Sequence, residues 1–253
     1  MKLLNIDRNA KTKKGQKKGY LTGIIYMAPA KLSGYEVCPM RTPGCTAACL
    51  NTAGMGIYSK VQESRIKKTK WFFEDRPAFM LQLEKEIEAF IKQAQKKDMI
   101  PVIRLNGTSD ILWERCSFLG KDGKHYNNIM ERFPDQTFYD YTKIYNRKNL
   151  PKNYSLTFSL AENNQSNALK ALQNNINVAI VFDKPPFPKE YWGYSVYDGD
   201  EDDLRFLDLK GIIALKAKGK ARKDTSGFVR KSNEIARRCY LGPQTSGFES
   251  LTL

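Results

Sequence analysis

Short apolar runs and amphipathic stretches alternate along most of the chain. The apolar runs span four to six residues and end in polar or glycine-containing segments, a pattern typical of buried β-strands. They predict strands at residues 23–27, 101–106, 137–141, 155–160, 178–182 and 212–215, with a weaker candidate at 194–197.

Two of the amphipathic stretches have the period of an α-helix. Pro77 suits a first helical position, and apolar residues follow it at three- and four-residue spacing as far as Ala94. A second apolar stripe runs from Ala168 to Ile176, after the polar turn at residues 163–166. These stripes predict helices over residues 77–94 and 168–176.

Strands that alternate with helices predict an α/β fold with a mostly parallel sheet covered on both faces. Six or seven strand–helix units favour a complete or partial β/α barrel over a doubly wound sheet. No linker of low complexity divides the chain. We therefore expect a basic N-terminal arm at residues 1–20 and a single β/α domain at 21–253, with a less regular basic tail after about residue 217.

Composition excludes several protein classes. The chain has 253 residues, of which 41% are hydrophobic, so disorder is not its main state. It contains neither a long uncharged apolar run nor a secretory leader, and we expect a soluble, cytoplasmic protein without a membrane partner. Its five cysteines are too few for a disulfide scaffold.

The net charge of +15 is concentrated in two windows. Residues 1–20 carry seven bases and one acid, and residues 210–238 carry ten bases and two acids. An acidic block at residues 198–203 precedes the second window. Either window can be an ordinary lysine-rich surface or can contact an acidic partner such as nucleic acid.

Three of the cysteines lie within twelve positions, directly after the first predicted strand. Cys38, Cys45 and Cys49 have the spacing Cys-x6-Cys-x3-Cys, in a loop with two prolines and a glycine. Helical geometry at residues 46–48 would place Cys45 and Cys49 on one face. Zinc sites usually have paired cysteines or nearby histidines, whereas thiolate ligands at irregular spacing are typical of an iron–sulfur cluster.

Two further cysteines are candidates for the fourth ligand of such a cluster. We favour Cys116, which follows the terminal loop of the second predicted strand and so lies at the same edge of the sheet. Cys239 is the other choice, and a buried thiol without metal is the alternative for each. The single histidine, His125, stands in a polar segment, and we expect it at the surface.

The segment from Cys38 to Gly54, together with Arg104 to Asp110, resembles the phage and plasmid family known as gene product 88. The similarity covers roughly residues 20–220. It implies a phage or mobile-element origin, and hence a host cytoplasm as the location, but not an activity, because the family name is a genetic label.

The order of elements also resembles the radical S-adenosylmethionine enzymes. In that family a three-cysteine loop after the first barrel strand binds a 4Fe-4S cluster, and a turn after the second strand contacts S-adenosylmethionine. The resemblance implies that Cys38, Cys45 and Cys49 hold iron and that Asn106, Gly107, Thr108 and Ser109 face the cofactor. The family spacing is Cys-x3-Cys-x2-Cys, which differs from the spacing here. A fourth thiolate from Cys116 would leave no open iron for S-adenosylmethionine.

Our leading hypothesis is an iron–sulfur protein, with a redox, structural or catalytic role and a host or phage redox partner. A second hypothesis is nucleic-acid binding by the two basic windows, with a structural metal site. A third is a hydrolase or transferase that uses carboxylates at the ends of the strands, namely Asp110, Asp140, Glu162 and Asp183. The sequence does not fix the oligomeric state.

Overall fold

The computed structural model describes residues 1–6 and 10–233, and these form a mixed α/β fold around one large sheet. Seven strands of this ten-stranded sheet form one continuous parallel run. In spatial order they are β2 (Tyr20–Ile25), β3 (Ile100–Arg104), β6 (Thr137–Thr142), β7 (Tyr154–Ser159), β8 (Val178–Phe182), β11 (Ile212–Lys216) and β10 (Tyr194–Asp198). The α/β class and the mostly parallel sheet are therefore confirmed.

Two antiparallel strands flank the parallel run, and a third short strand enters it. β1 (Leu4–Ile6) pairs with β2, and β9 (Glu190–Tyr191) pairs with β10. β12 (Val229–Arg230) pairs with the last two residues of β8, beyond the point where β7 pairs with it. A separate hairpin joins β4 (Phe118–Leu119) to β5 (His125–Tyr126). In the described part of the chain no ladder joins the two edges of the sheet, so a closed barrel is not observed.

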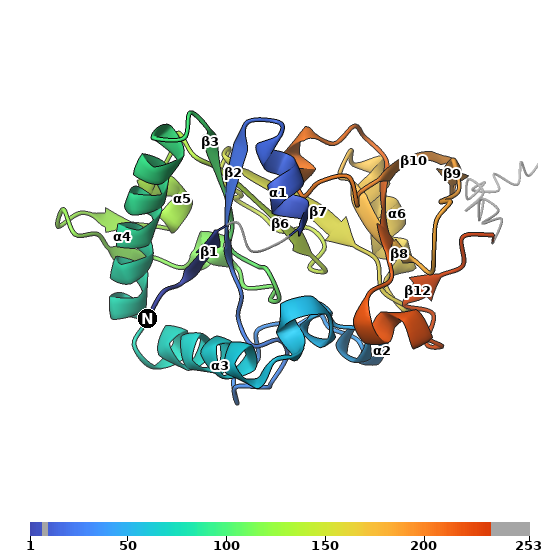
Figure 1. Cartoon of the computed structure of the whole chain (residues 1–253), viewed down its shortest axis with the longest axis horizontal. Helices are drawn as coiled ribbons and strands as arrows, with labels where there is room; N and C mark the ends of the chain where they lie inside the picture. The colour runs from blue at the N-terminus through green and yellow to red at the C-terminus, as the bar shows by residue number, and fades with distance from the viewer. Residues whose placement is uncertain (7–9, 234–253) are drawn as a thin grey trace, which may run out of the picture.

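Helices cover one face of the sheet (Figure 1). Helix α4 (Arg76–Gln95) packs Phe79, Leu83 and Phe90 against the first half of the parallel run. Helix α6 (Gln165–Gln173) packs Ala168 and Leu172 against β7 and β8. Both helices occur where the apolar stripes predict them, each beginning one to three residues earlier. The short helix α5 (Ile129–Arg132) also lies in the core beside α4.

The other face is covered by a loop and, beside it, by helix α1 (Ala10–Gln16), whose Gly15 lies next to Leu204 of that loop. The 3-10 turn at Arg205–Leu207 follows the acidic block, and Leu204 packs on Val102 and Tyr139. The loop brings Asp203 to Arg104, with 3.0 Å between Oδ2 and Nη1. The acidic block is thus partly buried by ion pairing with the sheet rather than fully solvated.

The first twenty residues contribute to the sheet and its cover. β1 extends the sheet, and α1 (Ala10–Gln16) packs against β2 and Leu204. Lys18 pairs with Asp202 at 2.5 Å and Lys11 with Asp200 at 2.8 Å, so the N-terminal basic window binds the acidic block within the same chain.

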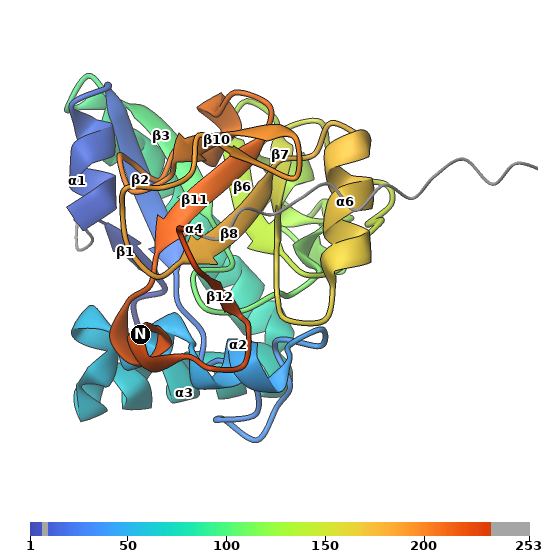
Figure 2. The same ribbon diagram turned by 90° about the vertical axis from the view of Figure 1, so that its right-hand side faces the viewer.

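The carboxyl ends of the parallel strands face a layer of loops and helices (Figures 1 and 2). This layer contains α2 (Pro43–Ala47), α3 (Ser59–Glu74), and 3-10 turns at Leu50–Thr52, Gly54–Ile57 and Gly219–Lys223. A further 3-10 turn, Trp113–Arg115, follows β3. Among the described residues no helix is long and apolar enough to cross a membrane.

Candidate functional site

The three clustered cysteines lie in the connection from β2 to α3, at the carboxyl end of the sheet. Thr42 caps α2, and its Oγ1 accepts a hydrogen bond from the backbone N–H of Cys45 at 3.0 Å. Cys45 is therefore inside the helix, Cys49 lies two residues after its end, and Cys38 precedes it. Residues 46 and 47 are helical, as expected, but the helix ends at Ala47 and Cys49 has a non-helical backbone, so the predicted common helical face of Cys45 and Cys49 is not observed.

The three thiols are close enough to influence one another. Burial raises the pKa of Cys38 to about 12, and the charges of Cys49, Asp110 and Cys45 raise it further. Burial also raises the pKa of Cys49, with Cys45 again contributing. All three are half-buried free thiols. Over residues 1–6 and 10–233, no set of three or more Cys, His, Asp or Glu side chains is already arranged to hold a metal ion.

The turn after β3 lies against the cysteine loop. The thiol of Cys38 lies 3.8 Å from the carbonyl oxygen of Thr108, whose own hydroxyl donates to the carbonyl of Met27 at 2.6 Å. Gly107 packs directly on β2, and a Cβ at that position would lie 2.6 Å from the carbonyl oxygen of Ile25. The turn therefore joins the ends of β2 and β3 beneath the cysteines.

Polar side chains of this turn form hydrogen bonds with other groups of the same segment. The Oδ1 of Asn106 accepts hydrogen bonds from the Ser109 hydroxyl at 2.8 Å and from the Trp113 indole at 3.1 Å. The backbone N–H of Ile111 donates to the same oxygen at 2.9 Å. The predicted contact of Asn106, Gly107, Thr108 and Ser109 with a cofactor stays a prediction, and the observed role of these residues is to shape the turn.

Cys116 is placed differently from the other three thiols. It is 5% exposed and lies in the core with Trp113, and its Sγ is 3.5 Å from the carbonyl oxygen of Leu112. Burial raises its pKa to about 11, and the charges acting on it are those of Arg76, Glu114 and Arg147 rather than those of other thiols. Cys38, Cys45 and Cys49 therefore share one loop, whereas Cys116 lies in the core, and the predicted ligand set of all four cysteines stays a prediction. Cys239 lies outside the described residues.

Two cations lie beside Cys49. The positive charges of Arg65 and Lys143 both lower its pKa, against the larger effect of burial. Arg65 extends from α3, is 8% exposed, donates to Asn51 Oδ1, and lies 4.9 Å from the centre of the Tyr26 ring. Its buried Nε has no hydrogen-bond partner among the described residues. These cations give the cysteine loop a positive local field.

Lys143 links the cysteine site to two more strands. It follows β6, and its ammonium donates to the hydroxyl of Ser159, at the end of β7, at 2.7 Å. Its backbone N–H donates to Asp110 Oδ2 at 2.7 Å. Burial raises the pKa of Asp110, and the bonds from Lys143 and Thr142 and the charge of Arg147 oppose that rise. One polar network therefore connects the ends of β3, β6 and β7.

The four carboxylates proposed as a catalytic set are held by separate donors. Asp140 accepts from the backbone N–H of Asn106 and from the Tyr154 hydroxyl, both at 2.8 Å. Glu162 binds the start of α2, and Asp183 accepts from the backbone and hydroxyl of Ser232. No metal-binding group forms from them within the described part of the chain. His125 is exposed on β5, as expected.

Sequence reasoning missed Arg65, Arg147 and the role of Glu162. Arg65 stands in a lysine-rich helical segment where exposure is the default, and only the fold shows that it faces the cysteine loop. Arg147 donates to Glu114 and lies 3.7 Å from Asp110, contacts that span more than thirty residues. No local signal could have identified these pairings.

A family model described as gene product 88 matches residues 2–232 of the chain. The match covers the cysteine loop, Cys116 and the turn after β3, and it ends before Cys239. No curated protein and no solved structure matches the chain.

Proposed function

The chain belongs to the gene product 88 family, and we propose that it binds an iron–sulfur cluster through Cys38, Cys45 and Cys49. The observation that supports the proposal is the position of these three cysteines in one loop at the carboxyl end of the parallel strands. Ligands of parallel α/β proteins bind at this end of the sheet. Three thiolates are the donor set that soft metals and iron–sulfur clusters require.

The charges around the thiols fit an anionic cluster better than they fit free thiols. Arg65 and Lys143 act on Cys49, and Arg65 keeps an unpartnered buried Nε beside the loop. A site with three bound thiolates carries negative charge, which these cations offset. Burial raises the pKa of the Cys38 and Cys49 thiols, so metal binding is expected to release protons and to depend on pH.

Cluster binding requires the loop to bring its three sulfur atoms onto a common centre. Thr42 and Glu162 fix the helix that carries Cys45, whereas Cys38 and Cys49 lie in irregular segments on either side of it. Irregular segments can change φ and ψ at lower cost than a helix interior. We propose that Cys45 is the fixed ligand and that Cys38 and Cys49 close around the cluster.

A cluster held by these three thiolates would supply electron transfer, and an iron without a protein ligand would be open to a small molecule such as S-adenosylmethionine. Cys116 is not among the ligands in this proposal, because it packs in the core against Trp113. The carbonyl oxygen of Thr108 lies 3.8 Å from the Cys38 thiol, which supports a contact between such a small molecule and the backbone of the turn after β3.

We also propose that the parallel strands form a partial β/α barrel. The order of the strands in the sheet follows their order in the chain for β2, β3, β6, β7 and β8. Helices α4 and α6 cover the same face of these strands. The opposite face is filled by Leu204 and the buried pair of Arg104 with Asp203. Helices outside and a side-chain-filled inner face are features of barrels.

Iron binding by cysteine variants tests the proposal. Cys45→Ser and Cys116→Ser are purified anaerobically beside the parent chain and reconstituted with iron and sulfide under identical conditions. Cys45→Ser is expected to lose most of its iron, whereas Cys116→Ser, the matched control, keeps it. Equal iron retention in both variants contradicts the proposal, and loss from Cys116→Ser alone assigns the site to a different set of ligands. Circular dichroism on each sample separates a lost ligand from a lost fold.

A further inference from the structure

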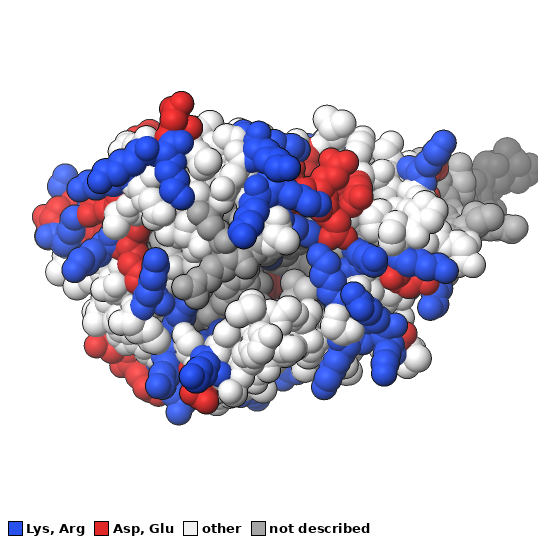
Figure 3. All heavy atoms as spheres, in the orientation of Figure 1, with Lys and Arg blue, Asp and Glu red and all other residues white. Residues whose placement is uncertain are grey.

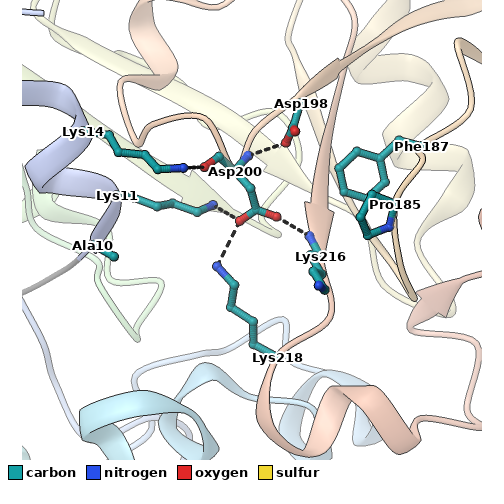
Figure 4. A pocket seen from close by; sticks show the side chains of 9 residues that line it. All are labelled: Ala10, Lys11, Lys14, Pro185, Phe187, Asp198, Asp200, Lys216 and Lys218. Carbon is teal, nitrogen blue, oxygen red and sulfur yellow. Dashed lines mark hydrogen bonds and ion pairs between the residues drawn. The ribbon is translucent and has the colours of Figure 1, made fainter. Parts of the chain in front are cut away.

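The two basic windows, far apart in the sequence, meet in space around Asp200. Lys11 and Lys218 each donate to Asp200 Oδ1, at 2.8 Å and 2.9 Å, and Lys14 donates to its backbone carbonyl at 3.0 Å (Figure 4). Asp200 Oδ2 accepts from the backbone N–H of Lys216 at 2.7 Å. One acid at the end of β10 thus gathers lysines from α1 and from the segment after β11.

Both carboxylate oxygens of Asp200 accept hydrogen bonds from the lysines around it. Burial raises its pKa, but Lys11, Lys216 and Lys218 outweigh that effect and hold the pKa at about 2. The carboxylate therefore stays ionised at any physiological pH and keeps the surrounding ammonium groups in place. A preorganised set of cations loses less conformational entropy when it binds an anion than separate mobile lysines do.

Two adjacent concavities lie beside this cluster. One has a volume of about 290 Å³ and includes Lys11, Lys14, Lys216 and Lys218. The other, of about 550 Å³, includes Lys184 and Lys231. Pro185 and Phe187 line both, so the two concavities adjoin along the segment after β8. We call this combined surface the lysine groove.

The lysine groove keeps an excess of positive charge after its internal pairs are formed. Six lysines and three aspartates line it, a net charge of +3. Each aspartate already has donors: Asp200 has the lysines, Asp183 has Ser232, and Asp198 accepts from the backbone N–H of Asp200 at 2.8 Å. Figure 3 shows that lysines and arginines gather on the same face over α1 and over the segment after β11.

The groove combines this charge with an aromatic surface. Phe187 is half-buried, and its ring centre lies 5.8 Å from that of Phe182, which holds it at the junction of the two concavities. Lysines flank it on both sides, from Lys216 in one concavity to Lys184 in the other. Phosphates at cationic rims and bases on an aromatic floor are the recurring elements of single-strand binding sites.

We propose that the lysine groove binds single-stranded nucleic acid through its sugar–phosphate backbone, with a base on Phe187. An acidic protein would satisfy the lysines but offers no regular alternation of anions and planar rings. The shared chemistry of RNA and DNA strands is sufficient for the contacts described. This inference does not depend on the cysteine site, since none of the groove residues lies in the cysteine loop.

Fluorescence anisotropy with labelled oligonucleotides tests the groove. The full chain is titrated into oligothymidine and oligouridine of about 20 nucleotides, longer than a single binding site, and into a duplex of the same length. Binding is measured between about 50 and 200 mM KCl, where phosphate contacts lose affinity steeply. The test variant carries Lys14→Gln, Lys184→Gln and Lys216→Gln. The control carries Lys85→Gln, Lys92→Gln and Lys96→Gln, three exposed lysines on α4 and at its C-cap, with the same total charge change.

We expect both single strands to bind at low salt and the groove variant to bind at least about tenfold more weakly than the control. Its log–log salt slope should fall by about 2, since each single-strand phosphate contact contributes about 0.7. Phe187→Leu should weaken single-strand binding more than duplex binding.

Polyglutamate is tested as an acidic peptide without bases. The assignment would be overturned by an absence of oligonucleotide binding at low salt or by equal losses of affinity in the two triple variants. It would also be overturned if the chain bound polyglutamate but not the oligonucleotides. A difference between the oligothymidine and oligouridine arms identifies which of the two strands the groove prefers. Iron content measured on the same samples separates this outcome from that of the cysteine site.

Discussion

Glu162 holds the helix that carries Cys45, since its Oε1 accepts a hydrogen bond from the backbone N–H of Gly44 at 2.7 Å. Its Oε2 accepts from the Thr42 hydroxyl at 2.6 Å. A carboxylate at the end of β7 thereby satisfies the first turn of α2, more than one hundred residues away in the sequence. The position of the cysteine loop therefore depends on a contact with the core sheet.

Removing this carboxylate should loosen the loop. Glu162→Ala leaves the Gly44 N–H and the Thr42 hydroxyl without their acceptor, and we expect the free energy of unfolding to fall by about 1–3 kcal/mol. Iron should also be lost faster to a chelator. Glu190→Ala, at an exposed glutamate on β9, is the control. Identical unfolding and iron-release curves for the two variants would refute the role of Glu162.

Gly107 is required by the close approach of two strand ends. A Cβ there would lie 2.6 Å from the carbonyl oxygen of Ile25, a backbone atom that cannot rotate away. We expect Gly107→Ala to lower the free energy of unfolding by about 1–3 kcal/mol. Gly15→Ala, in helix α1, is the matched substitution, because the added Cβ would meet only the Leu204 side chain, at 3.6 Å.

Gly15→Ala should leave stability unchanged or raise it by up to about 1 kcal/mol. Chemical denaturation of both alanine variants supplies the comparison. A Gly107→Ala chain as stable as the parent would mean that β2 and β3 can separate at this end without cost.

The buried carboxyl of Asp140 should make stability depend on pH. Burial raises its pKa from 3.8 to about 7, although Arg104 and the bonds from Asn106 and Tyr154 oppose the rise. Between these two values the folded chain binds a proton that the unfolded chain has released, so the free energy of unfolding falls as pH rises from about 4 to about 7.

Asp140→Asn removes this titration while keeping an oxygen that can accept from the Asn106 N–H. The difference in unfolding free energy between parent and variant should therefore change across that interval and level off above it. Urea denaturation at pH steps across the interval measures it. A constant difference between the two chains would show that Asp140 does not titrate there.

Much of the sheet could be predicted because its strands are continuous apolar runs. The run at 178–182 coincides with β8, and the run at 137–141 is one residue shorter than β6. The loop that covers the other face could not be predicted, because Asp203 and Arg205 are charged and charged residues are usually exposed. Asp203 is buried with Arg104, a contact between residues 99 positions apart, and Arg205 is buried with Asp202 and Asp208.

The same distinction applies to the candidate site. Cys38, Cys45 and Cys49 are close in sequence, so their spacing alone predicted a cluster. The cations beside Cys49 and the glutamate that holds α2 come from distant elements, and no local pattern marks them. The meeting of the two basic windows at Asp200 also depends on the order of strands in the sheet, which periodicity does not fix.

The pairing of α1 with the acidic block should also contribute to stability. Asp200→Asn removes the charge that Lys11 and Lys218 share, and we expect a loss of about 1–3 kcal/mol at neutral pH. Because the pKa of Asp200 is lowered to about 2, its contribution should be present above about pH 4 and decline toward pH 2. Glu201→Gln, at the exposed neighbouring acid, is the control for the charge change.

Thermal unfolding at several pH values compares the stability of the Asp200→Asn and Glu201→Gln variants. If Asp200→Asn and Glu201→Gln unfold at the same temperature at neutral pH, the pairing does not stabilise the chain.

The most direct test of the central claim is the iron and acid-labile sulfide content of the parent chain after anaerobic purification, with zinc measured on the same sample. The account predicts about four iron and four sulfide per chain, the content of a cubane cluster, with a visible absorption that dithionite bleaches. Zinc alone, or no metal after reconstitution, would contradict it and leave the three thiols without a cluster to bind.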